Sequence, residues 1–171
     1  MTPRGYGSAA AYCPRCAAAL AAAPPTRCAG CGYELFLNPR PTGGLVVLDG
    51  ARFLALRRAA EPGAGRWELP GGFCDGREHP ADAAVREGRE ELGVEVVLGE
   101  FVGMYLGDYE WQGELLPVLD CFFLATLDGG EITLDPAEST GLRWFALADP
   151  PPLAFPTMDA AVAEVRRRRR G

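Results

Sequence analysis

A run of acidic residues on one predicted helix limits the fold of this chain more than any other feature. The segment PADAAVREGREELG places Pro80 at a first helical position and Gly93 just past the last. At about 100° per residue, Glu87, Glu90 and Glu91 share a sector of about 100°. Like charges at this spacing destabilise a helix. Either something offsets this repulsion, or the cluster is an ordinary solvated helix face.

The opposite side of this helix is apolar. Ala81, Val85 and Leu92 fall there, and we expect them to pack against a β-sheet. Gly88 lies beside this apolar side. Because glycine costs about 1 kcal/mol relative to alanine inside a helix, we expect a neighbouring strand to approach closely at Gly88.

Strands are predicted on both sides of the helix. An Asp-Gly pair at 49–50 separates the apolar runs 43–48 and 52–58, which predicts a hairpin with a tight turn. Residues 66–72 predict a short strand that ends in a Pro/Gly turn. The order of elements predicts an α+β fold. Further strands are expected over 94–106, 115–127 and 141–147, and a closing helix over 157–170.

Four cysteines near the start of the chain form two Cys-x2-Cys pairs, Cys13 with Cys16 and Cys28 with Cys31. At this spacing four thiolates can reach one tetrahedral Zn²⁺, which predicts a structural zinc ribbon with no open position for catalysis. The glycines of CAGCG supply the backbone freedom that such turns need. Two disulfides are the alternative, but nothing in the sequence indicates secretion.

The charge of the chain is unevenly distributed. The net charge is −6, all seventeen basic residues are arginine, and five of them form the run 166–170. Without these five the net charge is −11, which argues against non-specific nucleic-acid binding and fits binding of divalent cations. No apolar run reaches the roughly 18 residues of a membrane span, and the alanine-rich start lacks the apolar core of a signal peptide. We therefore expect a cytoplasmic protein without a membrane segment.

Residues 72–94 resemble the Nudix box, G-x5-E-x7-R-E-U-x-E-E-x-G-U, where U is a bulky aliphatic residue. Every fixed position matches, and the one departure is Gly88 at the first U. The resemblance implies a Nudix fold, a mixed β-sheet sandwiched by helices, here preceded by a small zinc ribbon. The fixed positions are Gly72, Glu78, Arg86, Glu87, Glu90, Glu91 and Gly93.

The resemblance also implies how the acidic helix is used. Mg²⁺ or Mn²⁺ would neutralise it and act on a substrate diphosphate. Glu87 and Glu91 are then the leading ligands, Glu90 shares in ligation, and the carbonyl of Gly72 is a further ligand. The catalytic base would be one of these glutamates or Glu138, which precedes a predicted strand and is otherwise an ordinary polar turn residue.

Other residues are assigned supporting roles. Glu78 and Arg86 would brace the loop and the helix, and Arg86 could hold Glu90 from four residues away. Arg57 and Arg58 are candidates for binding a phosphate, and a solvated strand end is the alternative for them. The candidates for stacking on a base are Trp67, Tyr109 and Trp111, and a place in the protein core is the alternative for these.

The predicted zinc ribbon indicates the substrate class only in part. A four-cysteine ribbon before a Nudix domain resembles the NADH pyrophosphatase branch, yet the S-Q-P-W-P-F-P-x-S-like motif of that branch is absent after the box. We expect hydrolysis of the diphosphate linkage in a nucleoside diphosphate joined to another moiety, with ADP-ribose or a dinucleotide such as NADH preferred. The alternatives are a non-catalytic nucleotide sensor or adaptor, and decapping of nucleotide-capped RNA.

Three parts are expected along the chain. They are a flexible N-terminus with the zinc ribbon over 1–36, a Nudix hydrolase domain over 37–152, and a C-terminal helix with an arginine-rich tail over 153–171. The expected partner is a small-molecule nucleotide diphosphate, with no membrane and no nucleic acid other than capped RNA. A homodimer is left open.

Overall fold

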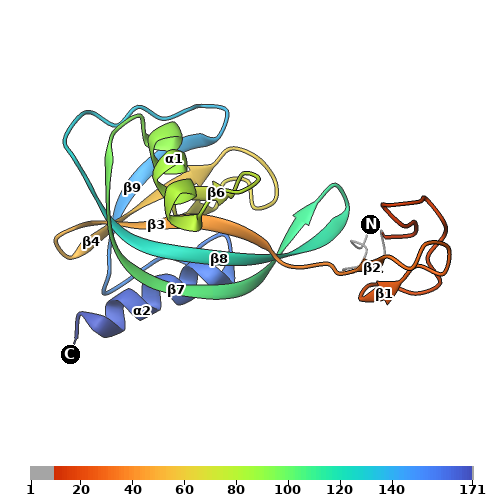
Figure 1. The fold of residues 1–171 in the computed structure, drawn as a ribbon. Helices are drawn as coiled ribbons and strands as arrows, with labels where there is room; N and C mark the ends of the chain where they lie inside the picture. Colours follow the sequence, from red (N-terminus) through yellow and green to blue (C-terminus); the bar gives the residue numbers. More distant parts are fainter. Residues whose placement is uncertain (1–9, 171) are drawn as a thin grey trace. The chain divides into compact units, whose positions relative to one another are not determined.

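The computed structural model describes residues 10–170 (Figure 1). The chain forms two compact units: one holds the chain up to Pro39 together with Asp108–Pro117, and the other holds Arg40–Gly107 together with Val118 onward. Residues 1–9 of the predicted flexible start, and the last residue of the tail, lie outside the described part. Between residues 10 and 170 no helix is long and apolar enough to cross a bilayer.

The larger unit is built on a mixed β-sheet with strand order β5-β4-β3-β8-β7. Strand β3 runs parallel to β8 and antiparallel to β4 and β6, while β9 pairs with β4. The elements are β1 (Thr26–Arg27), β2 (Glu34–Leu35), β3 (Arg40–Asp49), β4 (Arg52–Arg58), β5 (Trp67–Glu68), β6 (Gly71–Phe73), α1 (Pro80–Leu92), β7 (Val96–Trp111), β8 (Glu114–Leu127), β9 (Ser139–Ala146) and α2 (Pro156–Arg168).

The two helices cover opposite faces of the sheet (Figure 1). Successive residues of a strand point to opposite faces. Leu45 of β3 accordingly lies in one core with Leu92 of α1, and Val46 lies in a second core with Val162 of α2. All four side chains are fully or almost fully buried. The predicted α+β fold, with a mixed sheet between helices, is confirmed.

Helix α1 begins and ends at the predicted residues. Pro80 is its first residue, and His79 caps it by accepting a hydrogen bond from the Ala81 N–H at 3.1 Å. Gly93 follows the last turn in the left-handed conformation, with φ 66°, and its N–H donates to the Arg89 carbonyl. Glycine takes this conformation at little cost, which explains the sharp end of the helix.

Two strand predictions were wrong. Gly71 and Gly72 were expected to lie in a Pro/Gly turn but pair with β3 as part of β6. Strand β7 was expected to end near residue 106 but continues to Trp111, and only Gln112 and Gly113 separate it from β8. Both of these residues have positive φ, as a two-residue hairpin turn requires.

The close approach expected at Gly88 is present. A Cβ at this position would lie 2.6 Å from Leu45 Cδ1 and 2.8 Å from Val96 Cγ2. We therefore expect Gly88→Ala to lower the free energy of unfolding by about 1–2 kcal/mol in urea titrations, because overpacking outweighs the gain in helix propensity. Gly141→Ala is the matched control: a Cβ there meets nothing within 4 Å, so stability should change by less than about 0.5 kcal/mol. A stabilised Gly88→Ala protein would contradict the packing account.

The C-terminal arginines make contacts within the fold. Arg168 donates to the carbonyls of Phe101 and Val102 on β7, and Arg169 donates to the Gly50 carbonyl. Arg167 and Arg168 also form ion pairs with Glu164 on the same helix. The run thus fastens the end of α2 to strand β7 and to the turn between β3 and β4.

These contacts are expected to contribute unequally to the stability of the fold. We expect Arg168→Ala to lower the free energy of unfolding by about 1–3 kcal/mol, because it removes charge-assisted bonds to backbone carbonyls. Arg167→Ala removes only an exposed ion pair with Glu164 and should change the free energy of unfolding by less than about 0.5 kcal/mol. Equal effects in urea titration would show that the carbonyl contacts contribute nothing specific.

Candidate active site and cysteine metal site

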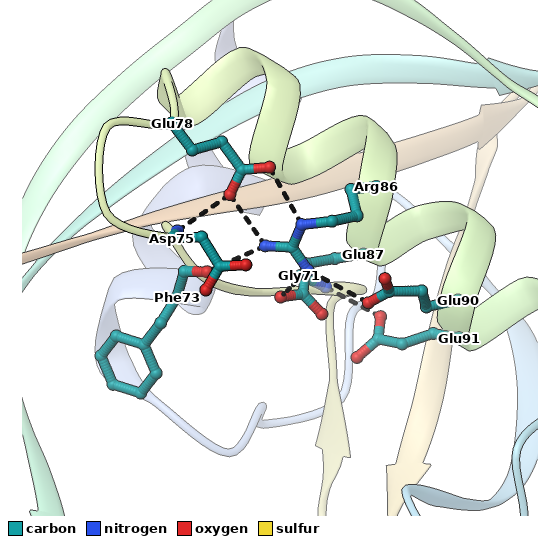
Figure 2. A network of polar contacts seen from close by, with 8 residues as sticks. All are labelled: Gly71, Phe73, Asp75, Glu78, Arg86, Glu87, Glu90 and Glu91. Atoms are coloured by element: carbon teal, nitrogen blue, oxygen red, sulfur yellow. Dashed lines mark hydrogen bonds and ion pairs between the residues drawn. The ribbon is translucent and has the colours of Figure 1, made fainter.

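Five fixed residues of the box gather where the loop after β6 meets α1, namely Glu78, Arg86, Glu87, Glu90 and Glu91 (Figure 2). Arg86 is the centre of this network. Its Nε and Nη2 donate to the two carboxylate oxygens of Glu78, each at 2.9 Å, and Nη2 also donates to the Phe73 carbonyl at 3.1 Å. Its Nη1 donates to Glu87 at 2.8 Å and to Glu90 at 3.0 Å. The expected contact between Arg86 and Glu90 is present, and the same guanidinium ties the loop to the helix.

Glu78 is held as a carboxylate by these bonds. Donation from Arg86 and from the Asp75 N–H, at 2.9 Å, lowers the pKa of Glu78 to about 2. The loop between β6 and α1 is therefore closed by a charged bridge with little dependence on pH in the neutral range.

Glu91 lies deeper than the helical spacing predicted. It is only 8% exposed, and its Oε2 accepts a hydrogen bond from the Gly71 N–H at 2.9 Å. Burial raises the pKa of Glu91 well above its usual range, and the charges of Glu68 and Glu87 raise it further. The expectation that all three acids face away from the sheet is wrong for Glu91, because β6 packs against this side of α1.

Glu87 and Glu90 differ from Glu91 and from each other. The Glu87 side chain is 16% exposed and lies so close to Gly72 that a Cβ there would be 2.4 Å from Glu87 Oε1. A side chain at Gly72 of β6 would therefore displace the Glu87 carboxylate. Burial raises the pKa of Glu87, and Arg86 opposes this effect. Glu90 is 56% exposed, so the helix has one exposed carboxylate, Glu90, and two largely buried ones, Glu87 and Glu91.

Two acids from other elements lie near these carboxylates. Glu138, just before β9, is exposed, and its charge raises the pKa of Glu68, Glu87 and Glu91. Glu68 of β5 was not predicted as a site residue. It is 5% exposed, and burial raises its pKa against an ion pair with Arg58. The sequence did not single out Glu68, because a charged residue between two apolar ones in a strand is the usual pattern of a side chain that faces solvent.

The substrate-binding candidates are not equally placed. Arg57 is exposed and donates to the Gly65 carbonyl at 3.1 Å, whereas Arg58 is engaged by Glu68. Trp67 packs against the core of the larger unit, in edge contact with Phe145 at 5.1 Å, as its alternative interpretation anticipated. Tyr109 and Trp111 have ring centroids 6.3 Å apart and belong to the smaller unit.

The four cysteines form a group of thiols whose sulfur atoms all lie within 4.8 Å of one another. In residues 10–170 no other His, Cys, Asp or Glu side chains, including those of the helix, gather as closely in threes or more. Cys13 and Cys31 are 3.7 Å apart at Sγ, and Cys16 and Cys28 are 3.6 Å apart. Thiolates at about 2.3 Å from one tetrahedral zinc are separated by about 3.8 Å. All four cysteines are free, so the disulfide alternative does not describe this structure.

The two cysteine turns share one backbone pattern. Ala17 N–H donates to the Cys13 carbonyl at 2.8 Å, and Gly32 N–H donates to the Cys28 carbonyl at 2.9 Å. Ala17 and Gly32 occupy equivalent positions and have φ of 59° and 72°. A backbone N–H of Cys31 lowers the pKa of Cys28 to about 7, whereas, against the Ala18 N–H, hydrogen bonds to Cys31 and Cys28 raise the pKa of Cys16 to about 12. A metal requires the thiolate form of each ligand.

Comparison with known proteins gives the following relationships. Residues 38–165 match the model of the NUDIX domain. A MutT-like protein of Streptomyces ambofaciens is 35% identical over 108 residues, which cover 63% of this chain and 64% of that protein. An ADP-ribose pyrophosphatase of Methanocaldococcus jannaschii is 30% identical over 125 residues, 72% of this chain and 71% of that one. The chain thus spans less than two thirds of the MutT-like relative's length.

A solved structure shares the fold. The MutT NUDIX hydrolase from Burkholderia pseudomallei superposes with a TM-score of 0.65 at 30% identity, covering 75% of this chain and 98% of its own.

Proposed function

Because this chain belongs to the NUDIX family, we propose that it is a pyrophosphohydrolase that cleaves the diphosphate linkage of a nucleoside diphosphate joined to another moiety. The observation that carries this proposal is the set of three carboxylates on one side of α1, gathered beside the glycines of β6 (Figure 2). ADP-ribose is the preferred substrate, supported by the relative named ADP-ribose pyrophosphatase. A dinucleotide such as NADH is the second choice.

The donor set fits Mg²⁺ or Mn²⁺. Glu87, Glu90, Glu91 and the Gly72 carbonyl would hold the ion with oxygen ligands, which hard dications prefer. Glu91 is compatible with this assignment, because an ionised carboxylate buried beside Glu68 and Glu87 needs a proton or a cation to neutralise it. When bound, the ion polarises a phosphoryl oxygen and lowers the pKa of an attacking water.

The protein side chains then have separate roles. Arg86 positions Glu87 and Glu90 through its Nη1, and Glu78 fixes Arg86 in turn. Glu138 is our candidate for the base that takes a proton from water, since its charge acts on the helix carboxylates and it is exposed to solvent. One of the helix glutamates is the alternative base.

The cysteine group has a structural role in this proposal. Cys13, Cys16, Cys28 and Cys31 would hold one Zn²⁺ with four sulfur ligands, leaving no open position for substrate. The spacing of their sulfur atoms supports the assignment.

A substrate screen tests the enzymatic proposal. ADP-ribose, NADH and nucleoside triphosphates are each incubated with Mg²⁺, Mn²⁺ or EDTA, and the products are identified by mass. We expect AMP and ribose 5-phosphate from ADP-ribose, with no turnover in EDTA. Nucleotide binding without any product would instead identify a sensor or adaptor and would reject the proposal.

Decapping of RNA is less well supported. It would use the C-terminal arginines as phosphate contacts, but Arg167, Arg168 and Arg169 already contact Glu164 or backbone carbonyls. If Arg167→Ala or Arg168→Ala lost more activity on capped RNA than on free ADP-ribose, this alternative would be revived.

A further inference from the structure

A buried ion pair lies on the side of the sheet that α1 covers. Glu68 of β5 is opposite Leu56 of β4, and residues in register share one face of a sheet. Leu56 packs in the core that contains Leu92 of α1, whereas Trp67, the neighbour of Glu68, packs in the core that contains Val162 of α2. Glu68 therefore faces the side on which α1 and its carboxylates lie.

The arginine of this pair is fixed by several contacts. Arg58 Nη1 donates to Glu68 Oε2. Arg58 Nε donates to the Pro62 carbonyl at 2.8 Å, and the guanidinium carbon lies 5.2 Å from the centre of the Phe155 ring. The side chains of Arg58 and Glu68 are only 15% and 7% exposed. Both charges are thus largely removed from water, so each depends on the other for compensation.

The pair lies beside the most buried acid of α1. Glu91 accepts a hydrogen bond from the N–H of Gly71, which is three residues along the chain from Glu68. Burial and then the charge of Glu68 raise the pKa of Glu91, so the two carboxylates lie close enough for their charges to interact. The Gly71 N–H is an uncharged donor. A divalent cation at Glu91 would therefore be next to a carboxylate that already carries an arginine.

We propose that Glu68 is a positioning residue of the metal site, which binds Arg58 and so prevents its positive charge from opposing a divalent cation at Glu91. The inference rests on the proposed function, because it deepens the account of that metal site. An arginine side chain stays protonated in proteins. Without Glu68 its charge would act on the cation through the protein interior, where charges are screened less than in water.

Two other interpretations of the pair make different predictions. In the first, Glu68 is itself a ligand of the cation. In the second, the pair only stabilises the fold, by fastening β4 to β5 and to the Pro62 carbonyl in the loop between them. The proposed role differs from both because it depends on the sum of the two charges and not on the presence of the Glu68 carboxylate.

Titration of the zinc-loaded protein with Mn²⁺ at pH 8, without substrate, tests this role, with free Mn²⁺ measured by EPR. Glu68→Gln leaves the charge of Arg58 uncompensated and should weaken Mn²⁺ binding by about tenfold or more. The double variant Glu68→Gln/Arg58→Gln removes both charges and should bind Mn²⁺ within about threefold of the wild type. Asp49→Asn breaks an exposed pair with Arg52 at the other end of β4 and should leave binding unchanged.

Recovery of binding in the double variant is the deciding result. If Glu68 ligates the cation or only stabilises the fold, removing Arg58 as well cannot restore binding, so a weakly binding double variant would overturn the assignment. Unchanged binding in Glu68→Gln would overturn it too. Should Glu68→Gln fail to fold, Arg58→Gln decides. Binding at least as tight as in the wild type then supports the role, and weaker binding rejects it.

The proposed function can fail separately. If the wild type binds Mn²⁺ but hydrolyses no substrate, the proposed function is rejected, while the titrations still decide the role of Glu68. If it hydrolyses ADP-ribose but Mn²⁺ binding does not respond to Glu68→Gln, only the role of Glu68 is rejected. A wild type that binds no Mn²⁺ would reject both.

Discussion

Replacing Glu91 with glutamine should remove most of the turnover and, in the absence of divalent metal, stabilise the fold. Loss of a metal ligand costs several kcal/mol of transition-state stabilisation, about a 10²- to 10⁴-fold fall in kcat. Glutamine can still accept the Gly71 N–H bond, but it carries no charge into a site that is 8% exposed. We expect the free energy of unfolding in EDTA to rise by about 1 kcal/mol or more.

The stabilisation expected for Glu91→Gln should depend on pH. The pKa of Glu91 is higher in the folded than in the unfolded protein, so its contribution is fully present at low pH and lost as pH rises through the folded pKa. The difference between Glu91→Gln and the wild type should therefore grow from pH 5 to pH 8 in urea titrations with EDTA. Glu100→Gln on β7 is an exposed control and should change neither kcat nor stability. Normal turnover in Glu91→Gln would reject the ligand role, and a less stable variant would reject the buried-charge account.

Removing the metal from the cysteine group should unfold the smaller unit while the larger one stays folded. Structural zinc contributes about 10–16 kcal/mol in zinc-finger peptides, and the segment around Cys13–Cys31 has little apolar core of its own. We expect one zinc per chain by elemental analysis. Cys28→Ser should lose it, together with the hydrogen-exchange protection of residues 10–39.

Two controls make this prediction specific. Cys74→Ser changes a cysteine outside the group and should retain one zinc per chain. Protection of β3 and α1 should persist in Cys28→Ser, because their cores lie in the larger unit. A protein purified without zinc, with a mass four hydrogens below the reduced chain, would contain two disulfides and would contradict the prediction.

Local chemistry in the sequence accounts for much of the fold. Pro80 and Gly93 fixed the limits of α1, because proline suits a first turn and glycine a left-handed end. The hairpin predicted at the Asp-Gly pair is present, although Asp49 pairs with Arg52 and the turn itself lies at residues 50–51. The spacing of the four cysteines was enough to predict that they meet. In each case the deciding interaction spans only a few residues, or involves a ligand geometry with few solutions.

The remaining features depend on contacts between distant residues. Parallel pairing of β3 with β8, 78 residues apart at Thr42 and Asp120, leaves no periodic signal in either strand. The burial of Glu91 follows from β6, a strand of three residues whose glycines read as a turn. Helical spacing could group the acids on one sector, but it could not show that a second strand covers part of that sector.

The contact between Arg168 and β7 also bears on how the protein behaves at high concentration. Strand β7 is the last strand in the described sheet order, and such edges can recruit strands from other molecules. While α2 is in place, Arg168 occupies the carbonyls of Phe101 and Val102 in the middle of β7, so these acceptors are not available to an incoming strand. Detachment of the C-terminal helix, well short of global unfolding, would then be the event that starts aggregation.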